Sequence, residues 1–477
     1  MSGFADYEHY DALGLAELVR QNKVTPSALL DAAIERVEAR NPAINAVVMK
    51  LYDYAKKTIA DGLPDGPFRG VPFLMKDLTS AVAGVGMTRG SRFFADTAPA
   101  TADSEHVKRL KRAGLVIFGR TNTPEHGLSL TCEPRLYGPT RNPWDVTRIS
   151  AGSSGGAAAA VAARILPMAH ASDGFGSIRA PAACCGVVGL KPTRSRNTFA
   201  PYAGEGIAGL ATEHAVTLSV RDCAALLDAT RGAGPGDPYV APLPAGPYLN
   251  EVGQKPGKLR IAWTAAAPNG VSVDPECLRA LADTVALCAE LGHQVEQRDP
   301  EIERAAVVPT FLTLASTATI LNFGSHPNTG RAAREEDVER ITWLTAKMGE
   351  KITAADYARA MQTAHRLSRQ MAAFHADWDV LLTPGLGMLP PKLGWIDMMM
   401  DDVDEYWRRV FTFSPFTVWF NITGQPAVML PLDQSKTGLP IATQLVGRYG
   451  DEATLFRLSA QLEAAKPWFD RKPAMAS

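Results

Sequence analysis

Short apolar runs alternate with longer amphipathic segments along most of this chain. The runs are rich in Val, Ile and Leu and are bounded by Gly, Pro or polar residues, which is typical of buried strands. The clearest of them lie at 115–119, 259–263, 294–296, 379–384 and 427–431. Strands that alternate with amphipathic segments predict an α/β fold, although the pattern does not give the order of the strands.

Helix signals and one polar segment divide the chain further. The expected helices cover 26–40, 157–164, 275–292 and 451–464. The first should end at Arg40, because Asn41-Pro42 follows it and proline interrupts a helix. A polar, Pro/Gly-rich segment at 232–257 predicts a surface connection, after which a second α/β stretch covers about 258–384.

Composition and charge favour a cytoplasmic enzyme. The 477 residues carry a net charge of −1, which gives no electrostatic reason to expect nucleic acid or an anionic membrane as a partner. No run approaches 18 apolar residues, and the start of the chain lacks the pattern of a signal peptide. The six cysteines show no CxxC spacing, and Cys184-Cys185 are expected to be buried thiols. The nine histidines form no HExxH pattern, so neither a metal nor a cofactor is predicted.

Two glycine-rich loops and one lysine carry the candidate chemistry. Ser153 lies in the run Gly152-Ser-Ser-Gly-Gly, and Ser177 lies in Asp173-Gly-Phe-Gly-Ser. Glycines allow backbone N–H groups to converge, as an oxyanion hole requires. A phosphate-binding loop is the competing interpretation, but a P-loop needs Lys-Ser or Lys-Thr after its second glycine, and neither follows Gly156.

Lys76 ends the apolar run 71–75, and this environment bears on its protonation. A lysine with the reference pKa of about 10.4 is protonated at pH 7 and cannot act as a base. Burial disfavours the charged form and can lower the pKa by several units. The sequence therefore predicts a serine hydrolase in which Lys76 replaces histidine as the base.

At this point the chain resembles the amidase signature family. The matching text includes 70–77, 119–125, 138–145, both serine loops, 186–193 and 421–427, in family order. The resemblance implies one domain over 1–477, with a large mixed sheet covered by helices on both faces and a signature core at about 65–200. It also implies that Ser177 is the nucleophile, Lys76 the base and Ser153 a bridging serine after a cis peptide bond.

The resemblance further assigns the residues around the triad. Backbone N–H groups of Gly174, Phe175, Gly176 and Ser177 are implied as oxyanion donors. Ser154, Asp173 and Arg179 are expected to support the site. One departure is visible, since Phe175 stands where the family usually has glycine. In its less distinctive segments, outside the triad motifs, the chain looks most like hydrolases of nylon-oligomer cyclic amides, urethanases and aryl acylamidases.

A segment rich in methionine and aromatic residues at 385–420 is a candidate for the substrate site. Such side chains build adaptable apolar surfaces, so the segment is expected to be either core or a lid. The candidate substrate-binding residues are Phe175, Trp395, Met398, Met399, Met400 and Trp407.

Two functions from different classes remain open. The first is an amidase or urethanase that acts alone, as monomer or homodimer, on a small apolar amide or carbamate. The alternative is a glutaminase subunit that delivers ammonia to a partner enzyme. The alternative predicts charged groups for the α-amine and α-carboxylate of glutamine, whereas Phe175 and the 385–420 segment favour an apolar substrate. A binding relative without activity is disfavoured, because the lysine and both serines are kept.

Overall fold

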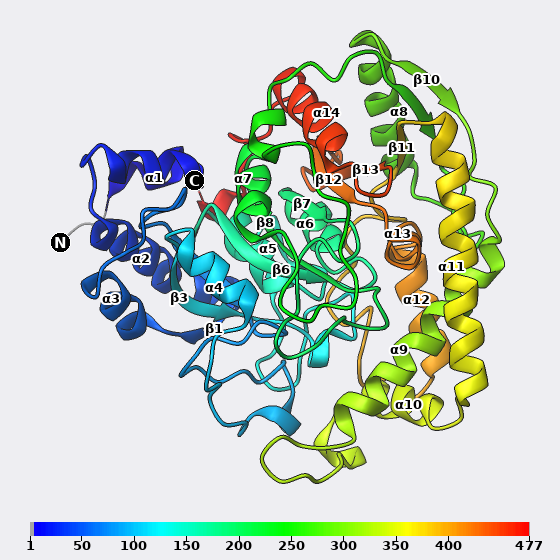
Figure 1. Ribbon diagram of the computed structural model, residues 1–477, viewed down its shortest axis with the longest axis horizontal. Helices are drawn as coiled ribbons and strands as arrows, with labels where there is room; N and C mark the ends of the chain where they lie inside the picture. Colours follow the sequence, from blue (N-terminus) through cyan, green and yellow to red (C-terminus); the bar gives the residue numbers. More distant parts are fainter. Residues whose placement is uncertain (1–3, 477) are drawn as a thin grey trace.

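A computed structural model describes residues 4–476, and a mixed sheet of 11 strands forms its centre (Figure 1). The sheet order is β1-β3-β2-β6-β8-β7-β12-β13-β11-β9-β10. Its strands are β1 (Val47–Lys50), β2 (Pro72–Lys76), β3 (Val116–Thr121), β6 (Met168–Asp173), β7 (Val188–Lys191), β8 (Thr212–Thr217), β9 (Arg260–Trp263), β10 (Gln294–Gln297), β11 (Val380–Pro384), β12 (Ala427–Gln434) and β13 (Pro440–Gly447). A separate pair joins β4 (Arg141–Asn142) and β5 (Asp145–Ile149). The predicted α/β fold is confirmed.

Parallel and antiparallel pairs are grouped in different parts of the sheet. Strand β2 runs parallel to both β3 and β6, whereas β6, β8, β7, β12, β13 and β11 are antiparallel neighbours in turn. The second α/β stretch predicted from the sequence extends the same sheet, because β11, β9 and β10 form its parallel edge.

Helices surround this sheet (Figure 1). They are α1 (Ala12–Arg20), α2 (Pro26–Ile44), α3 (Tyr52–Ala60), α4 (Glu105–Arg112), α5 (Gly155–Ala162), α6 (Arg179–Cys185), α7 (Val220–Thr230), α8 (Pro275–Glu290), α9 (Val307–Phe323), α10 (Arg340–Gly349), α11 (Ala354–Asp377), α12 (Val403–Phe413), α13 (Val418–Thr423) and α14 (Glu452–Ala465). Cys184 and Cys185 are buried free thiols in α6, as predicted.

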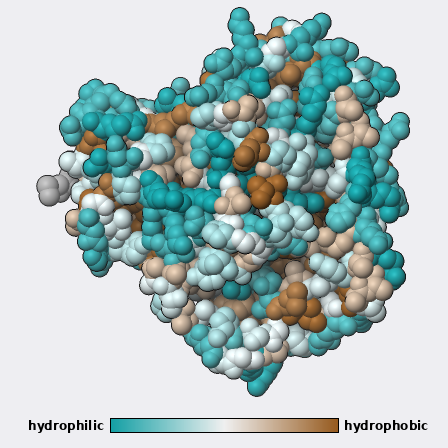
Figure 2. Space-filling view, in the orientation of Figure 1, coloured by the Kyte–Doolittle hydropathy of each residue, from teal (hydrophilic) through white to brown (hydrophobic). Residues whose placement is uncertain are grey.

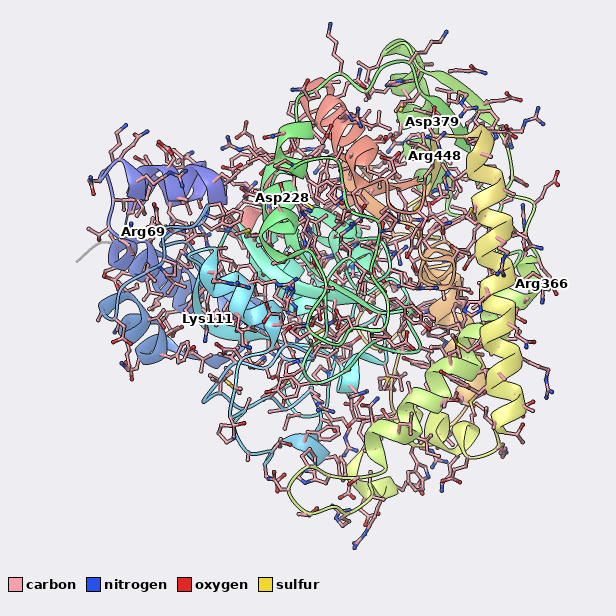
Figure 3. All side chains as sticks on the ribbon, viewed as in Figure 1. Arg69, Lys111, Asp228, Arg366, Asp379 and Arg448 are labelled. Carbon is pink, nitrogen blue, oxygen red and sulfur yellow. The ribbon has the colours of Figure 1, made fainter. Side chains whose placement is uncertain are left out.

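Alternate residues along the strands face two different hydrophobic cores. In β11, Val380 and Leu382 pack into a core with α7, α8 and α14, whereas Leu381 packs into a larger core that includes α5, α6, α9 and α11. Successive side chains of a strand point to opposite faces, so both faces of the sheet are buried. At one end of β11, Arg448 stabilises the turn that follows α11. It donates to the His375 carbonyl and pairs with Asp379 (Figure 3).

The predicted end of the first helix is wrong. Helix α2 continues through Pro42 to Ile44 and ends where Asn45 adopts a left-handed conformation, with a φ of 51°. Proline lacks one donor, and its fixed φ suits a helix, so Pro42 is accommodated in the last turn. The Asn41 side chain then accepts the N–H groups of Ala46 and Val47, which leads the chain directly into β1.

One helical stretch passes a test for a membrane span, although the sequence shows no unbroken run of 18 apolar residues. Arg304–Phe323 is long and apolar enough, by length and composition alone, to cross a membrane, and 44% of its most apolar window is buried inside the protein. Its helix α9 packs against α10, α11 and α13, which accounts for much of that apolar surface. The face drawn in Figure 2 is mainly hydrophilic, with small separate apolar patches.

Candidate active site

Lys76 is the last residue of β2 and is fully buried. Its Nζ donates to Ser153 Oγ at 2.6 Å and to Ser172 Oγ at 3.0 Å. It forms no ion pair with any residue of the 4–476 range. Burial lowers the pKa of Lys76 to about 7, because little in its surroundings replaces the water that would stabilise the ammonium ion. The Lys76 amine therefore points at two serine hydroxyls and is mainly neutral above about pH 7.

Ser153 and Ser154 lie at the turn into α5, and the Gly152–Ser153 peptide bond is cis, as the family resemblance implies. Ser154 joins this turn to the loop that carries Ser177. Its N–H donates to the Ser177 carbonyl at 3.1 Å, and its Oγ donates to the Ser172 carbonyl at 3.2 Å. The two serine loops are thereby held together by backbone contacts.

The loop between β6 and α6 is folded around the carboxylate of Asp173. This carboxylate accepts the N–H groups of Gly176 at 2.7 Å and of Ile178 at 3.1 Å. Gly176 has a φ of 133°, and a Cβ there would lie 2.5 Å from Thr417 Oγ1. Only glycine fits this position, so the sequence dictates the shape of the loop at Gly176.

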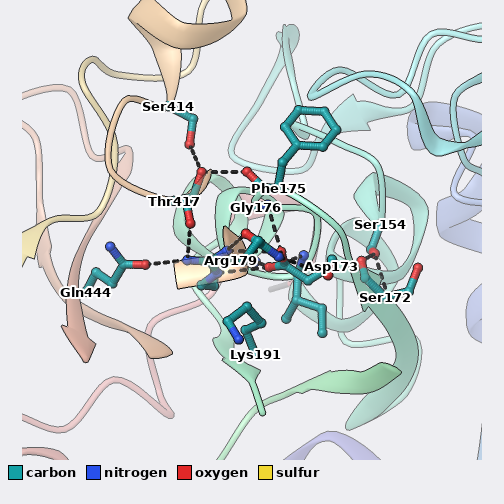
Figure 4. A network of polar contacts seen from close by, with 12 residues as sticks. Ser154, Ser172, Asp173, Phe175, Gly176, Arg179, Lys191, Ser414, Thr417 and Gln444 are labelled. Atoms are coloured by element: carbon teal, nitrogen blue, oxygen red, sulfur yellow. Dashed lines mark hydrogen bonds and ion pairs between the residues drawn. The ribbon is translucent and has the colours of Figure 1, made fainter. Parts of the chain in front are cut away.

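Arg179 completes the support beneath the loop (Figure 4). The buried guanidinium donates Nε and Nη2 to Asp173 at 2.9 and 3.0 Å. It also donates to the Thr417 carbonyl, Gln444 Oε1 and Asn421 Oδ1 at 2.8, 2.8 and 2.5 Å. Burial works to raise the pKa of Asp173, but the Arg179 charge and the hydrogen bonds from Arg179 and Asn421 together outweigh it and hold the pKa below its usual range. This is a fully paired ionic network, in which each charge is stabilised by the other.

The predicted set of oxyanion donors needs one correction. The N–H of Gly176 is already donated to Asp173, so it is not available to a substrate oxygen. Within the described residues, the N–H groups of Gly174, Phe175 and Ser177 have no acceptor, and these three residues line the neighbouring cavity. They are the amides placed to stabilise a developing oxyanion.

Ser153, Ser172 and Ser177 open onto a cavity of about 310 Å³. The other walls come from the loop after β2, the short helix η3 (Glu125–Gly127), the segment 199–211 and helix α9. Most of the lining is apolar; the large apolar side chains are Leu78, Met87, Leu128, Phe175, Phe199, Ile207 and Phe311. The cavity therefore suits a ligand with a substantial apolar part.

The segment 385–420 does not line this cavity, which corrects the expectation of a lid. Trp395, Met398, Met400 and Trp407 all pack against or within the hydrophobic core, and Met399 is exposed on the surface. Trp407 lies behind the wall, with its ring 6.2 Å from that of Phe175 and 5.8 Å from that of Phe311. The segment supports the cavity from outside, and only Phe175 of the predicted substrate-binding residues reaches it.

A second buried polar cluster lies behind Lys76. His106, His170 and Glu213 bring ligand atoms within 4.8 Å of one another, a spacing that could hold a metal ion. However, His170 Nδ1 accepts the N–H of Lys76, so a neutral His170 carries its proton on Nε2, which lies 3.6 Å from Glu213 Oε1. Glu213 also accepts the hydroxyls of Thr79 and Ser80. This bonding favours a support for the Lys76 backbone over a metal site.

Several supporting residues were missed in the sequence. Ser172 contacts the Lys76 amine, and Thr417 and Gln444 hold Arg179. Ser172 directly precedes Asp173, so its place in the loop was a usable signal. Asn421 lies in a segment that resembles the family, but its contact with Arg179 depends on the folded chain. Thr417 and Gln444 carry no motif that would single them out.

A model of the amidase family matches residues 28–456. The chain belongs to the amidase family. It is 38% identical to a 6-aminohexanoate-cyclic-dimer hydrolase from a Pseudomonas species (strain NK87), over 98% of this chain and 96% of that protein. A 6-aminohexanoate cyclic dimer hydrolase solved with substrate superimposes with a TM-score of 0.93, 36% identity and coverage of 99% and 100% of the two chains.

A bacterial aryl acylamidase of the amidase signature family is also similar. Its structure gives a TM-score of 0.87 at 25% identity and covers 96% of each chain. The protein is thus a hydrolase of carbon–nitrogen bonds, built on the fold that its sequence resembles.

Proposed function

We propose that this amidase hydrolyses small, largely apolar amides or carbamates through an acyl-enzyme on Ser177. One observation carries the proposal. A fully buried lysine amine, with its pKa lowered to about 7, donates to serine hydroxyls that open onto the same cavity as Ser177. A neutral amine so placed is a general base.

The proposed reaction begins when the neutral Lys76 amine takes a proton from Ser153, as Ser153 takes one from Ser177. The Ser177 oxygen attacks the carbonyl carbon, and the amides of Gly174, Phe175 and Ser177 stabilise the oxyanion. The carbon–nitrogen bond then breaks, and the amine leaves with a proton returned through Ser153. A water molecule attacks the acyl-enzyme by the same proton path, which releases the acid and restores Ser177.

The apolar character of the substrate is supported by the cavity walls and by the relatives. The Phe175 and Phe311 rings lie 4.8 Å apart at one wall, where they would contact aryl or methylene groups. The relatives named above act on a cyclic amide of aminohexanoate and on aryl acylamides. Carbamates belong to the proposal because they pass through the same kind of tetrahedral oxyanion.

The glutaminase alternative is less well supported. Glutamine is short and strongly polar, and apart from Arg89 and Glu205 the cavity wall is mainly apolar and would leave it with few partners. The identity to the cyclic-dimer hydrolase, 38%, extends over nearly the whole of both chains and favours the amide substrate.

A substrate panel tests the proposed function. Initial rates should be measured on anilides, aliphatic amides, cyclic oligoamides, carbamates and glutamine. We expect anilides and oligomethylene amides to give the highest kcat/KM. A serine-directed sulfonyl or phosphonate reagent should label Ser177, as mapped by peptide mass spectrometry. Glutamine as the best substrate, or labelling at another serine, would refute the proposal.

A further inference from the structure

Within the described part of the chain, two charged side chains line the cavity, Arg89 and the exposed Glu205, and neither has a role in the proposed chemistry. Arg89 lies in the loop after β2 and lines the cavity, together with His126 of η3 and Asn322 at the end of α9. The Arg89 carbonyl accepts the N–H of His126 at 2.7 Å, which ties this loop to η3. The Arg89 guanidinium stacks 4.5 Å over the ring of Phe94. These contacts hold a cation in the wall of a mainly apolar space.

The Arg89 guanidinium has no carboxylate partner. Among residues 4–476 it forms neither an ion pair nor a side-chain hydrogen bond, unlike Arg120 and Arg179, which face Asp77 and Asp173. Asp77 is the carboxylate whose charge acts on Arg89. However, the Asp77 carboxylate already lies 3.8 Å from Arg120 Nε and accepts the Thr88 hydroxyl. It therefore pairs with Arg120 and not with Arg89.

The two polar neighbours of Arg89 in the cavity wall, His126 and Asn322, carry no charge at pH 7. Burial, and then the Arg89 charge, lowers the pKa of His126 to about 3, so His126 is neutral at pH 7. Its Nδ1 is buried without a partner. The Asn322 amide donates its N–H to the Ala318 carbonyl at 2.7 Å. A partly buried cation normally has a partner, because removing it from water without one is costly.

We propose that Arg89 binds a carboxylate of the substrate, separated from the scissile amide by an apolar segment. This rests on the proposed function, because it assigns the substrate class of the same cavity. The favoured substrates are then amides of amino acids with a distant carboxylate, or half-amides of dicarboxylic acids. Arg89 is suited to this because its planar fork can donate two parallel hydrogen bonds to a carboxylate.

Matched pairs of substrates test the proposal. Hexananilide is the neutral reference, adipic acid monoanilide carries a carboxylate on the acyl side, and 4-(hexanoylamino)benzoate carries it on the amine side. The measured quantity is the ratio of kcat/KM for each acid to that for hexananilide. We expect a ratio above 1 in one of the two arms, and that arm identifies the side that Arg89 contacts.

The Arg89→Gln variant should reduce that ratio by about 10- to 100-fold, as expected for the loss of a charge-assisted hydrogen bond. Arg89→Lys keeps the charge without the fork and should retain part of the preference. Arg92→Gln is the matched control, since Arg92 is exposed on the same loop and does not line the cavity. Its ratio should equal that of the wild type.

Binding separates this inference from the proposed function. Calorimetry with Ser177→Ala should show that the preferred acid binds more tightly than hexananilide, and that adding Arg89→Gln removes the difference. A ratio of 1 or less in both arms, or a ratio unchanged in Arg89→Gln, would overturn the role of Arg89 while the amidase activity stands. Acid binding that depends on Arg89, without hydrolysis of any amide, would support the inference and refute the proposed function.

Discussion

Two fully buried basic side chains, Arg179 and Lys76, lie within this site and differ in their partners. Arg179 forms two hydrogen bonds with Asp173 and three more with a carbonyl and two side-chain amides. Lys76 meets serine oxygens and, among the residues that the structure describes, has no carboxylate partner. The comparison teaches that a buried cation with a carboxylate partner can support the structure, whereas burial without one lowers the pKa of Lys76. Arg179 serves as a scaffold, and Lys76 serves as a base.

The largest expected effect comes from removing the Ser177 hydroxyl, which Lys76 is proposed to activate through Ser153. Replacing Ser177 with alanine should lower kcat by a factor on the order of 10⁴ or more, because the covalent step is lost. The circular dichroism spectrum should stay unchanged. Ser325→Ala, at an exposed serine, is the control and should keep full activity. A Ser177→Ala enzyme with a substantial fraction of activity would refute the assignment.

The next test restores a permanent charge at the lysine position. Lys76→Arg should lower kcat by about 10²- to 10⁴-fold, because a guanidinium does not give up its proton in the working range of pH. Lys76→Ala should lose a similar amount. Steady-state rates of both variants decide the matter. An active arginine variant would mean that the charge of residue 76, and not its basicity, matters.

Breaking the network around Arg179 should lower the stability of the fold. Arg179→Met removes the partner of a buried carboxylate, and the free energy of unfolding should fall by about 3–5 kcal/mol. Urea denaturation followed by fluorescence measures this change. The control is Arg366→Met, which breaks an exposed ion pair with Glu303 on the outer face of α11 (Figure 3) and should cost no more than about 1 kcal/mol. Equal losses in the two variants would contradict the network described here.

The pH dependence of kcat/KM tests the protonation of Lys76 directly. Since burial lowers its pKa to about 7, the amine is mainly neutral above that pH and gains a proton below it. The value of kcat/KM should therefore fall about tenfold per pH unit on the acid side and level off above pH 7. A profile measured from pH 5 to 9 tests this. A plateau reached only near pH 10 would show that Lys76 is not desolvated.

The smallest expected effect concerns Phe175, which touches both regions. Its carbonyl accepts the Thr417 hydroxyl at 2.7 Å, and its ring lines the cavity. Each methylene added to an acyl chain should raise kcat/KM by up to about 4-fold until the cavity is full. Phe175→Gly should flatten that series, and Phe175→Leu should keep most of it. A series that is flat in the wild type would contradict the apolar substrate.

Much of this site could be predicted because its residues lie in short, distinctive segments. Lys76, Ser153, Ser177 and the Asp173–Arg179 loop were predicted as site residues from local motifs, and the structure brings them together. The availability of individual N–H groups could not be predicted, because it depends on how Asp173 turns the backbone toward Gly176.

The cavity walls were harder to predict than the triad. Apolar composition does not distinguish a core from a binding wall, so the segment 385–420 was a plausible substrate contact. Part of the actual wall comes from 199–211 and from α9, whose sequences carry no binding motif. Arg89 was also missed, because an arginine in a surface-like loop is common and its lack of a partner is visible only in three dimensions.

The partners of Arg179 also set when the enzyme can first become active during its synthesis. Thr417, Asn421 and Gln444 follow Arg179 by 238, 242 and 265 positions. A ribosome has therefore made both serine loops and Lys76 long before it makes the residues that fix Arg179 and Gly176. Contacts between such distant residues form late in folding. A nascent chain that has not yet emerged beyond residue 444 should carry every proposed catalytic side chain and still hydrolyse nothing.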